Sequence, residues 1–210
     1  MATGRTESRA ARAPSLIERT RRTQLIDVTL ELVAEHGYAG TSLARIARAA
    51  GITKGAVLYH FPSKDAVIAA ARDQVLAELV ADVGAAVESS PVSAAPAVYV
   101  RRMVEHLTGH PYRARMIVES GLHEASLRPA SAPGSGARPA PAERWQPLAL
   151  LLQHARPTRG TGPASDLRTL AIAVGGAIDG LISEKLDDPS FDAVAAAETV
   201  VRMLEGELFC

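Results

Sequence analysis

The sequence predicts an all-α protein, and three observations carry this expectation. Hydrophobic residues make up 47% of the 210 residues, many of them Ala, Leu and Val, whereas aromatic residues make up only 4%. This composition favours helices over strands. Apolar residues also recur at spacings of three and four along most of the chain, and no strand pattern of any length appears. We therefore expect about nine helices, arranged as an N-terminal helix-turn-helix head followed by a larger helical bundle.

Three helices are expected in the head, residues 16–64, behind a flexible basic arm of residues 1–15. The first helix ends in "EHGYAG", residues 35–40, where Gly37 is suited to the left-handed position that follows a helix. Ser42 can cap a second helix of about two turns, and Thr53 can cap the third. Two short helices joined by a tight turn form a helix-turn-helix, whose second helix can lie in the major groove of DNA.

The body, residues 65–210, begins in the first turn of a long helix. Ser63 caps this helix, which ends near Glu88. Five further helices are expected at 95–109, 111–127, 146–156, 164–186 and 191–208. Residues 128–142 contain four Pro, two Gly and no large apolar side chain. Such a segment cannot bury enough surface to offset the entropy of ordering it, so we expect a disordered loop there.

The formal net charge is zero, but the charges are unevenly distributed. Residues 1–64 contain ten Lys and Arg against five Asp and Glu, and the other 146 residues contain thirteen against eighteen. A basic head on an acidic body indicates a polyanionic partner for the head, and a merely solvated basic face is the alternative. The lone Cys210 excludes an internal disulfide framework. Because no stretch of 18 apolar residues and no apolar N-terminal segment occurs, we expect a cytoplasmic protein without a membrane span.

The start of the expected third helix is thin and rich in hydrogen-bond donors. In "GITKGAVLYHFPSKDAV", residues 51–67, Gly55 and Ala56 leave the first turn nearly bare, so its backbone can approach base edges. Lys54 can reach acceptors on guanine, and the methyl group of Ala56 can pack on a thymine methyl. We therefore expect this turn to meet the bases.

Polar side chains around this helix are placed to hold DNA phosphates, namely Thr53, Tyr59 and His60. Lys64 stands in the first turn of the next helix, where the positive end of the helix dipole disfavours a cation by roughly 0.3–1 kcal/mol. A phosphate at that helix start would turn the penalty into a gain. The amides behind Ser42 could hold a phosphate in the same way. A packing role for Tyr59 and a capping role for His60 are the alternatives.

Arg45 points away from the apolar face of the second helix, and we expect it to contact DNA rather than solvent alone. Arg48 lies on a different side and is expected to be solvated. The third helix should dock onto the first two through one apolar face made of Val57, Leu58 and Phe61. The arginines of the arm either follow the minor groove or make no contact: Arg5, Arg9 and Arg12.

The stretch "LVAEHGYAGTSLARIARAAGITKGAVLYHFPSKDAV" closely resembles the DNA-binding head of the TetR (tetracycline-repressor) family of transcriptional regulators. The matching motifs are Gly-Tyr before Thr-Ser, Ala-Gly-Ile at 50–52, and Tyr-His-Phe at 59–61 followed by Lys64. They cover the first third of the chain. The resemblance implies a dimeric repressor that binds an inverted repeat in double-stranded DNA and that a small-molecule ligand releases.

The last two expected helices carry broad apolar stripes, a pattern that more often means intramolecular core. The resemblance implies instead that this pair meets its symmetry mate as a four-helix bundle. The expected dimer interface comprises Leu167, Leu170, Val174, Ile178, Leu181, Val194, Val201 and Leu204. Gly175, Gly176 and Gly180 would let the two backbones approach closely. The heads would then face successive major grooves about 34 Å apart.

A mostly apolar ligand of modest size is expected to bind inside the body, with residues 128–142 as a lid or entrance. One face of the 95–109 helix is adaptable and sparsely polar, as small-molecule pockets tend to be. The expected lining residues are Tyr99, Met103, His106, His110, Tyr112, Met116, His123, Trp145, Leu148 and Leu152. The alternative is that these side chains fill an ordinary core.

Two pairs of residues four apart could share a helix face as metal ligands do: His106 with His110, and Glu119 with His123. Without a further ligand this signal is weak, and we expect no metal and no cofactor.

Three functions are compatible with these features. The first is a ligand-responsive repressor. The second is a DNA-binding dimer whose body docks another protein and takes no small molecule. The third is an enzyme or carrier with a vestigial head. We do not expect an enzyme, because no Gly-rich phosphate loop, Gly-x-Ser-x-Gly elbow or Cys/His nucleophile arrangement occurs.

Overall fold

The computed structural model describes residues 15–127, 145–155 and 166–209, without the side chains of 120–127 and 207–209. Within these ranges every regular element is a helix, which confirms the all-α prediction. The helices are α1 (Leu16–Gly40), α2 (Leu43–Ala49), α3 (Lys54–His60), α4 (Lys64–Glu88), α5 (Ala95–Gly109), α6 (Pro111–Leu127), α8 (Gln146–Ala155), α9 (Leu167–Asp187) and α10 (Ala193–Phe209).

Several predictions concern residues outside these ranges. The basic arm with its three arginines, and the disordered loop or lid at 128–142, stay predictions. The side chain of His123 is also outside the description. Among the helices that the structure describes, none has the length and apolar character that crossing a membrane requires.

Helix α1 begins with a capping box. The Ser15 hydroxyl accepts a hydrogen bond from the amide of Glu18, and the Glu18 carboxylate accepts one from the amide of Ser15. The helix ends within residues 35–40, as the sequence predicted. Gly37 has φ 70° and ψ 172°, which kinks the chain, and helical backbone then resumes as far as Gly40. Glycine permits this kink, because it adopts a positive φ without the strain that other residues would have.

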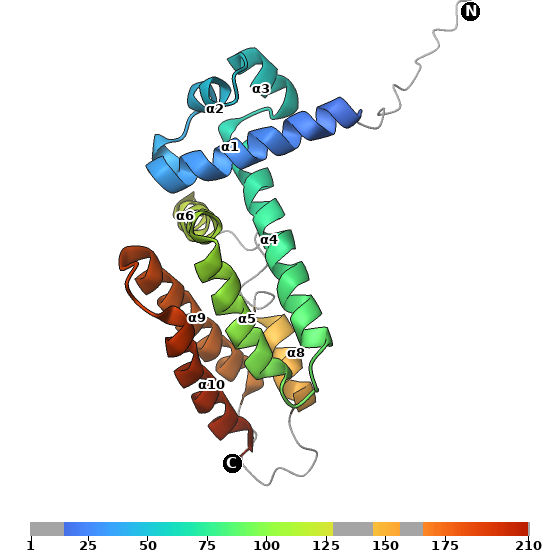
Figure 1. Cartoon of the computed structure of the whole chain (residues 1–210), viewed down its shortest axis with the longest axis vertical. Helices are drawn as coiled ribbons and strands as arrows, with labels where there is room; N and C mark the ends of the chain where they lie inside the picture. Colours follow the sequence, from blue (N-terminus) through green and yellow to red (C-terminus); the bar gives the residue numbers. More distant parts are fainter. Residues whose placement is uncertain (1–14, 128–144, 156–165, 210) are drawn as a thin grey trace, which may run out of the picture.

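The head has a core of its own. Side chains from α1, α2, α3 and the first turns of α4 are buried together, including Leu25, Val33, Ile46 and Phe61. This head core reaches along α4 as far as Val75. Figure 1 shows α2 and α3 at one end of the molecule, with α1 between them and the body.

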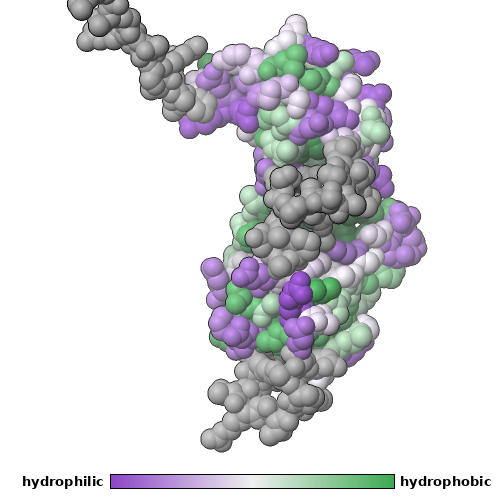
Figure 2. Space-filling model, turned by 180° about the vertical axis from the view of Figure 1, so that it is seen from behind, coloured by the Kyte–Doolittle hydropathy of each residue, from purple (hydrophilic) through white to green (hydrophobic). Residues whose placement is uncertain are grey.

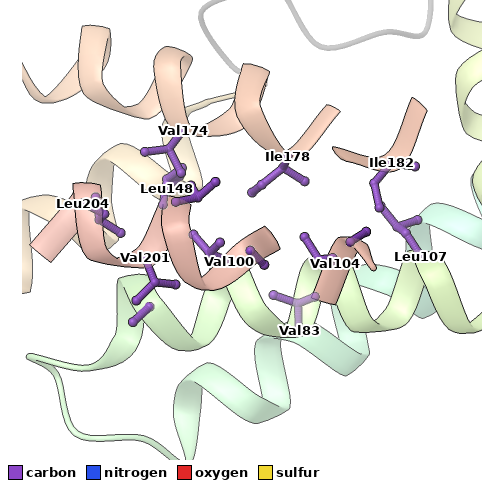
Figure 3. Close-up of a cluster of buried hydrophobic side chains, with 14 of the residues drawn as sticks. Val83, Val100, Val104, Leu107, Leu148, Val174, Ile178, Ile182, Val201 and Leu204 are labelled. Carbon is purple, nitrogen blue, oxygen red and sulfur yellow. The ribbon is translucent and has the colours of Figure 1, made fainter. Parts of the chain in front are cut away.

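The body core lies among α4, α5, α8, α9 and α10. In Figure 3, valines from α5 and aliphatic side chains from α9 and α10 point toward one another. A bidentate ion pair between Arg101 of α5 and Glu198 of α10, with N–O distances of 2.7 and 2.8 Å, joins two of these helices at the surface. Apolar burial of this extent is the main stabilising contribution in a helical bundle.

Helix α6 belongs to both halves of the molecule. Met116 is fully buried in the head core, and Ile117 packs against both cores. Figure 1 shows α6 directly against α1, and α6 also packs along α4. The sequence placed Met116 in a ligand pocket of the body. That placement is wrong, because α6 turns this side chain toward the head.

Candidate nucleic-acid interface

Helix α3 presents a bare and exposed first turn, as predicted. Its N-cap Thr53 accepts a hydrogen bond from the amide of Ala56 at 3.2 Å. Lys54 and Gly55 are exposed, and a Cβ added at Gly55 would meet only the Thr53 hydroxyl, at 3.8 Å. The backbone of this turn is therefore open to a close-fitting surface such as base edges.

The docking face of α3 is narrower than predicted. Val57 and Phe61, four residues apart, are buried in the head core, but Leu58 is 42% exposed. Consecutive residues of an α-helix are rotated by about 100° around the helix axis, so Leu58 points in a different direction from the buried Val57. Leu58 therefore lies on the outer side of α3, and its predicted docking role is wrong.

The C-terminal end of α3 is held by two residues of α1. Arg22 donates a hydrogen bond to the carbonyl of His60 and lies 4.1 Å from the centroid of the Phe61 ring. The Tyr59 hydroxyl donates to the Glu18 carboxylate at 3.0 Å, while 74% of the Tyr59 side chain remains exposed. A guanidinium at a helix C-terminus satisfies carbonyls that have no intrahelical partner.

The turn between α1 and α2 uses Ser42 and Arg45. The Ser42 hydroxyl caps α2 by accepting from the amide of Arg45 at 3.2 Å. The Arg45 guanidinium donates to the carbonyl of Gly40 at 2.6 Å. Arg45, the exposed Arg48 and His36 line a surface hollow of about 290 Å³ between α1 and α2. This arrangement leaves the predicted DNA contact of Arg45 untested and gives the side chain a structural role.

Lys64 has partners inside the protein. Its ammonium group donates to the carbonyl of Tyr38 at 2.9 Å and lies 4.2 Å from the centroid of the Tyr38 ring. The Tyr38 hydroxyl in turn donates to Asp65, and burial together with this carboxylate raises the pKa of Tyr38. The position of a cation at the start of α4 is thus explained without a phosphate, and a phosphate contact stays a prediction.

Three residues of this interface were missed by sequence reasoning: Glu18, Arg22 and Tyr38. Glu18 and Arg22 were counted only as charges, and Tyr38 only as part of a motif. Their partners lie 26 to 41 residues away in the chain. No local spacing pattern reports contacts at that separation.

The predicted pocket residues of α5 form a graded series from core to surface. Tyr99 and Met103 are half-buried against the body core, His106 is 8% exposed, and His110 is exposed. Nδ1 of His106 lies 2.7 Å from a carboxylate oxygen of Asp82. Nε2 of His106 is buried and has no hydrogen-bond partner in the described part of the chain.

The remaining predicted pocket residues are spread out. Leu148 and Leu152 are fully buried in the body core, which Trp145 packs against, whereas Tyr112 is 59% exposed. The structure therefore brings Tyr99, Met103 and the α8 residues to one core, and separates Tyr112 and Met116 from them. No group of three or more His, Cys, Asp or Glu side chains that could hold a metal occurs among the described residues.

The predicted dimer residues are largely internal. Val174, Ile178, Val201 and Leu204 are buried in the body core of a single chain. They cannot face a symmetry mate, so these four assignments are wrong. Both faces of α9 carry apolar or small residues. The apolar stripe in the sequence therefore identified the face that packs into the body core, and not the outer face.

The other assignments on these helices fare differently. Leu167, Leu170 and Leu181 are half-buried against the same core, and Val194 is 44% exposed. Gly175 is not free for a partner chain either, because a Cβ there would lie 1.8 Å from the Trp145 ring. Gly176 and Gly180 have open space.

Comparison with known proteins agrees with the geometry of the head. Residues 25–71, from α1 through the helix-turn-helix into α4, match the family model of bacterial regulatory proteins, tetR family. The head of this chain is similar to the heads of TetR-family regulators. TetR-family proteins are DNA-binding transcriptional regulators, and the exposed first turn of α3 lies within the matched segment.

Individual TetR-family relatives match over different lengths. The chain is 32% identical to the HTH-type transcriptional regulator RutR of Escherichia coli over 103 residues, which is 49% of each chain. It thus spans about half the length of that relative. It is 28% identical to AcrR of Shigella flexneri over 195 residues, 90% of each chain.

The fold of most of the chain also resembles solved structures of transcriptional regulators. One is the transcriptional regulator FadR of Bacillus subtilis in complex with stearoyl-CoA, with a TM-score of 0.66 and 18% identity. The similarity covers 87% of this chain and 96% of that one. At this identity, the likeness concerns the fold.

Proposed function

We propose that this protein is a dimeric transcriptional repressor that a small-molecule ligand releases from an inverted repeat in DNA. The observation that carries the proposal is the first turn of α3. Lys54 and Gly55 are exposed there, while Val57 and Phe61 fix the helix to the head core. A helix held in this way can enter the major groove with its N-terminal residues toward the bases.

The proposed base contacts come from Lys54, Gly55 and Ala56. Proposed phosphate contacts come from the side chains around them: Ser42, Arg45, Thr53, Tyr59, His60 and Lys64. Figure 2 shows hydrophilic residues over much of the head on the face seen from behind. Phosphate contacts fix the position of a protein on DNA, and base contacts supply its sequence preference.

The proposed dimer surface is the outer face of α9 and α10. Ile172, Gly176 and Gly180 are exposed at four-residue intervals along α9, and Met203 of α10 is 68% exposed. Small residues on such a face allow two helices to approach closely. A two-fold axis there would pair the heads, so the DNA site would be an inverted repeat.

The proposed ligand site lies in the body beside Tyr99, Met103 and Trp145. His106 would be the polar side chain that forms a hydrogen bond to the ligand. A buried nitrogen without a partner costs about 1–3 kcal/mol, which a ligand group that hydrogen-bonds to Nε2 would recover. FadR of Bacillus subtilis, which is similar in fold, was solved with stearoyl-CoA. The stearoyl chain of that ligand supports a ligand with a long apolar part.

A second candidate is a DNA-binding dimer without a small-molecule ligand, whose body docks another protein. The complete burial of Leu148 and Leu152 favours this candidate, because two of the expected pocket walls fill the core. The similar proteins are transcriptional regulators, and we propose no catalytic role.

The two candidates differ in a gel shift. The protein is bound to DNA from upstream of its own gene, and protein-free cell extract fractions and stearoyl-CoA are added separately. The first candidate predicts release by at least one of these, and weaker release from a His106→Phe variant that still binds the DNA. Persistent binding with every addition would favour the second candidate, and absence of any DNA binding would contradict both.

A further inference from the structure

The junction between α1 and α2 is fixed from outside the head. Gly37 turns the chain with φ 70°, so that the amide of Tyr38 leaves the hydrogen-bond pattern of the helix. This amide donates instead to the carboxylate of Glu119 at 2.8 Å. Glu119 lies on α6, 81 residues further along the chain. A body helix thus supplies the partner for a backbone group at the entrance to the helix-turn-helix.

Glycine at position 37 favours this contact in two ways. It adopts a positive φ without strain. It also leaves room for the carboxylate, because a Cβ at this position would lie 3.1 Å from the nearer oxygen of Glu119. The kink at Gly37 and the Glu119 carboxylate therefore belong to the same contact.

Tyr38 is held on three sides. Its amide donates to Glu119 of α6, its carbonyl accepts from Lys64 of α4, and its hydroxyl donates to Asp65 of α4. Carboxylate and ammonium partners make such hydrogen bonds stronger than neutral ones. The peptide around Tyr38 is consequently fixed relative to both helices that connect the head to the body.

The position of Tyr38 determines where α2 starts. The amide of Thr41 donates to the carbonyl of Tyr38 at 3.3 Å, and the Thr41 hydroxyl donates to the carbonyl of Gly37 at 2.9 Å. Ser42, the cap of α2, follows directly. Because α2 packs on α3, a shift of the Tyr38 peptide would move the helix that faces DNA.

Neighbouring contacts place Glu119 firmly. Met116, one turn before it on α6, is buried in the head core, and Arg115 donates to the carbonyl of Ala34 on α1 at 3.4 Å. We propose that Glu119 is a positioning residue for DNA binding. By holding the Tyr38 peptide, it keeps α2 and Lys64 in the arrangement that the head presents to DNA. The proposal rests on DNA binding by the head and not on ligand release.

The test compares substitutions of Glu119 in the full-length protein. Glu119→Ala removes the acceptor, whereas Glu119→Gln keeps an oxygen that can accept from the Tyr38 amide. Glu31→Ala, which removes an exposed carboxylate from α1, is the matched control. Affinity is measured by fluorescence anisotropy for a duplex selected with the wild-type protein and for a random-sequence duplex. Hydrogen exchange at the Tyr38 amide reports the contact itself.

We expect Glu119→Ala to lose about tenfold in affinity for the selected duplex, with faster exchange at Tyr38. A tenfold change corresponds to about 1.4 kcal/mol. Glu119→Gln and Glu31→Ala should stay within about threefold of the wild-type protein, since hydrogen bonds to neutral acceptors are weaker but still form. If Glu119→Ala fails to fold, Glu119→Asp, which withdraws the carboxylate by one methylene, replaces it with the same expectation.

Wild-type affinity in a variant whose Tyr38 amide exchanges fast would overturn the proposal. So would equal losses in Glu119→Ala and Glu119→Gln, because the charge and not the hydrogen bond would then matter. The failure of the proposed function looks different, since the wild-type protein itself would then bind no duplex.

Discussion

At the scale of single residues, Glu18 stands out because it is an acid on a face expected to meet phosphates. Its carboxylate closes the capping box of α1 and accepts from the Tyr59 hydroxyl. The two roles can be separated, since Gln at the same helix position also completes a capping box. Glu18 therefore holds Tyr59 in place, while its negative charge repels the phosphates of DNA.

Glu18→Gln should tighten DNA binding. A carboxylate roughly 8 Å from a phosphate charge costs about 0.5 kcal/mol in water, which corresponds to about twofold in affinity. The gain should shrink as salt rises, because salt screens exposed charges. Fluorescence anisotropy at low and high salt measures it. Unchanged or weaker binding at low salt would show that Tyr59 and Glu18 do not face DNA.

Asp82 of α4 is held by two side chains of α5. It accepts hydrogen bonds from Arg102 at 2.6 Å and from His106 at 2.7 Å, and these hold its pKa below the ordinary value of 3.8. Because the folded state has the lower pKa, the stabilisation is complete above the ordinary pKa. It is lost as the pH falls through the folded-state pKa.

Asp82→Asn should therefore lower the free energy of unfolding at pH 6 and flatten its fall below about pH 4. Urea unfolding at several pH values between 6 and 3 measures both effects. An unchanged slope in the acid range would mean that the carboxylate gains nothing from its two partners.

At the scale of helices, the contact of α8 with α9 depends on one glycine. A Cβ at Gly175 would lie 1.8 Å from the Trp145 ring, so Gly175→Ala must displace the indole. We expect a loss of about 1–3 kcal/mol in unfolding free energy, as for other overpacked cores. Trp145 is the single tryptophan, so its emission in a urea titration reports the displacement directly.

Gly84→Ala is the matched control for this prediction. A Cβ at Gly84 in α4 has open space, so alanine should stabilise the helix by about 0.5–1 kcal/mol. Equal stability and unchanged emission of Gly175→Ala and the wild-type protein would show that the indole does not rest on α9.

Helix positions were predicted well from the sequence, and helix surroundings less well. Ser42, Thr53 and Ser63 cap helices as expected, because capping depends on neighbouring residues. The inner and outer faces of α9 were exchanged, since small and apolar residues cover both. The burial of Met116 in the head core and the hydrogen bond from the Tyr38 amide to Glu119 are contacts between residues far apart in the chain, for which a local pattern has no signal.

At the scale of the whole molecule, the corrected placement of α9 changes which substitution should separate a dimer. Gly176 is exposed with open space around it, whereas Ile178 is buried in the body core. Gly176→Arg should give helical monomers with weakened DNA binding. Ile178→Arg should instead unfold the body, because a buried unpaired charge is strongly destabilising.

Light scattering after size exclusion, with circular dichroism, distinguishes these outcomes. Gly109→Arg, an exposed change at the end of α5, should remain dimeric. A dimeric Gly176→Arg variant would show that the subunits meet elsewhere. A monomeric wild-type protein that binds DNA would show that no dimer is needed.

The central claim is that paired heads read DNA with the first turn of α3, and selection from a random duplex pool tests it most directly. The wild-type protein should enrich an inverted repeat with half-sites centred about 34 Å apart or a multiple of this distance. Lys54→Ala should enrich the same repeat with relaxed preference at particular base pairs, by about 1–3 kcal/mol. Enrichment of no sequence, of a single unrepeated site, or of an identical site by both proteins would contradict the claim.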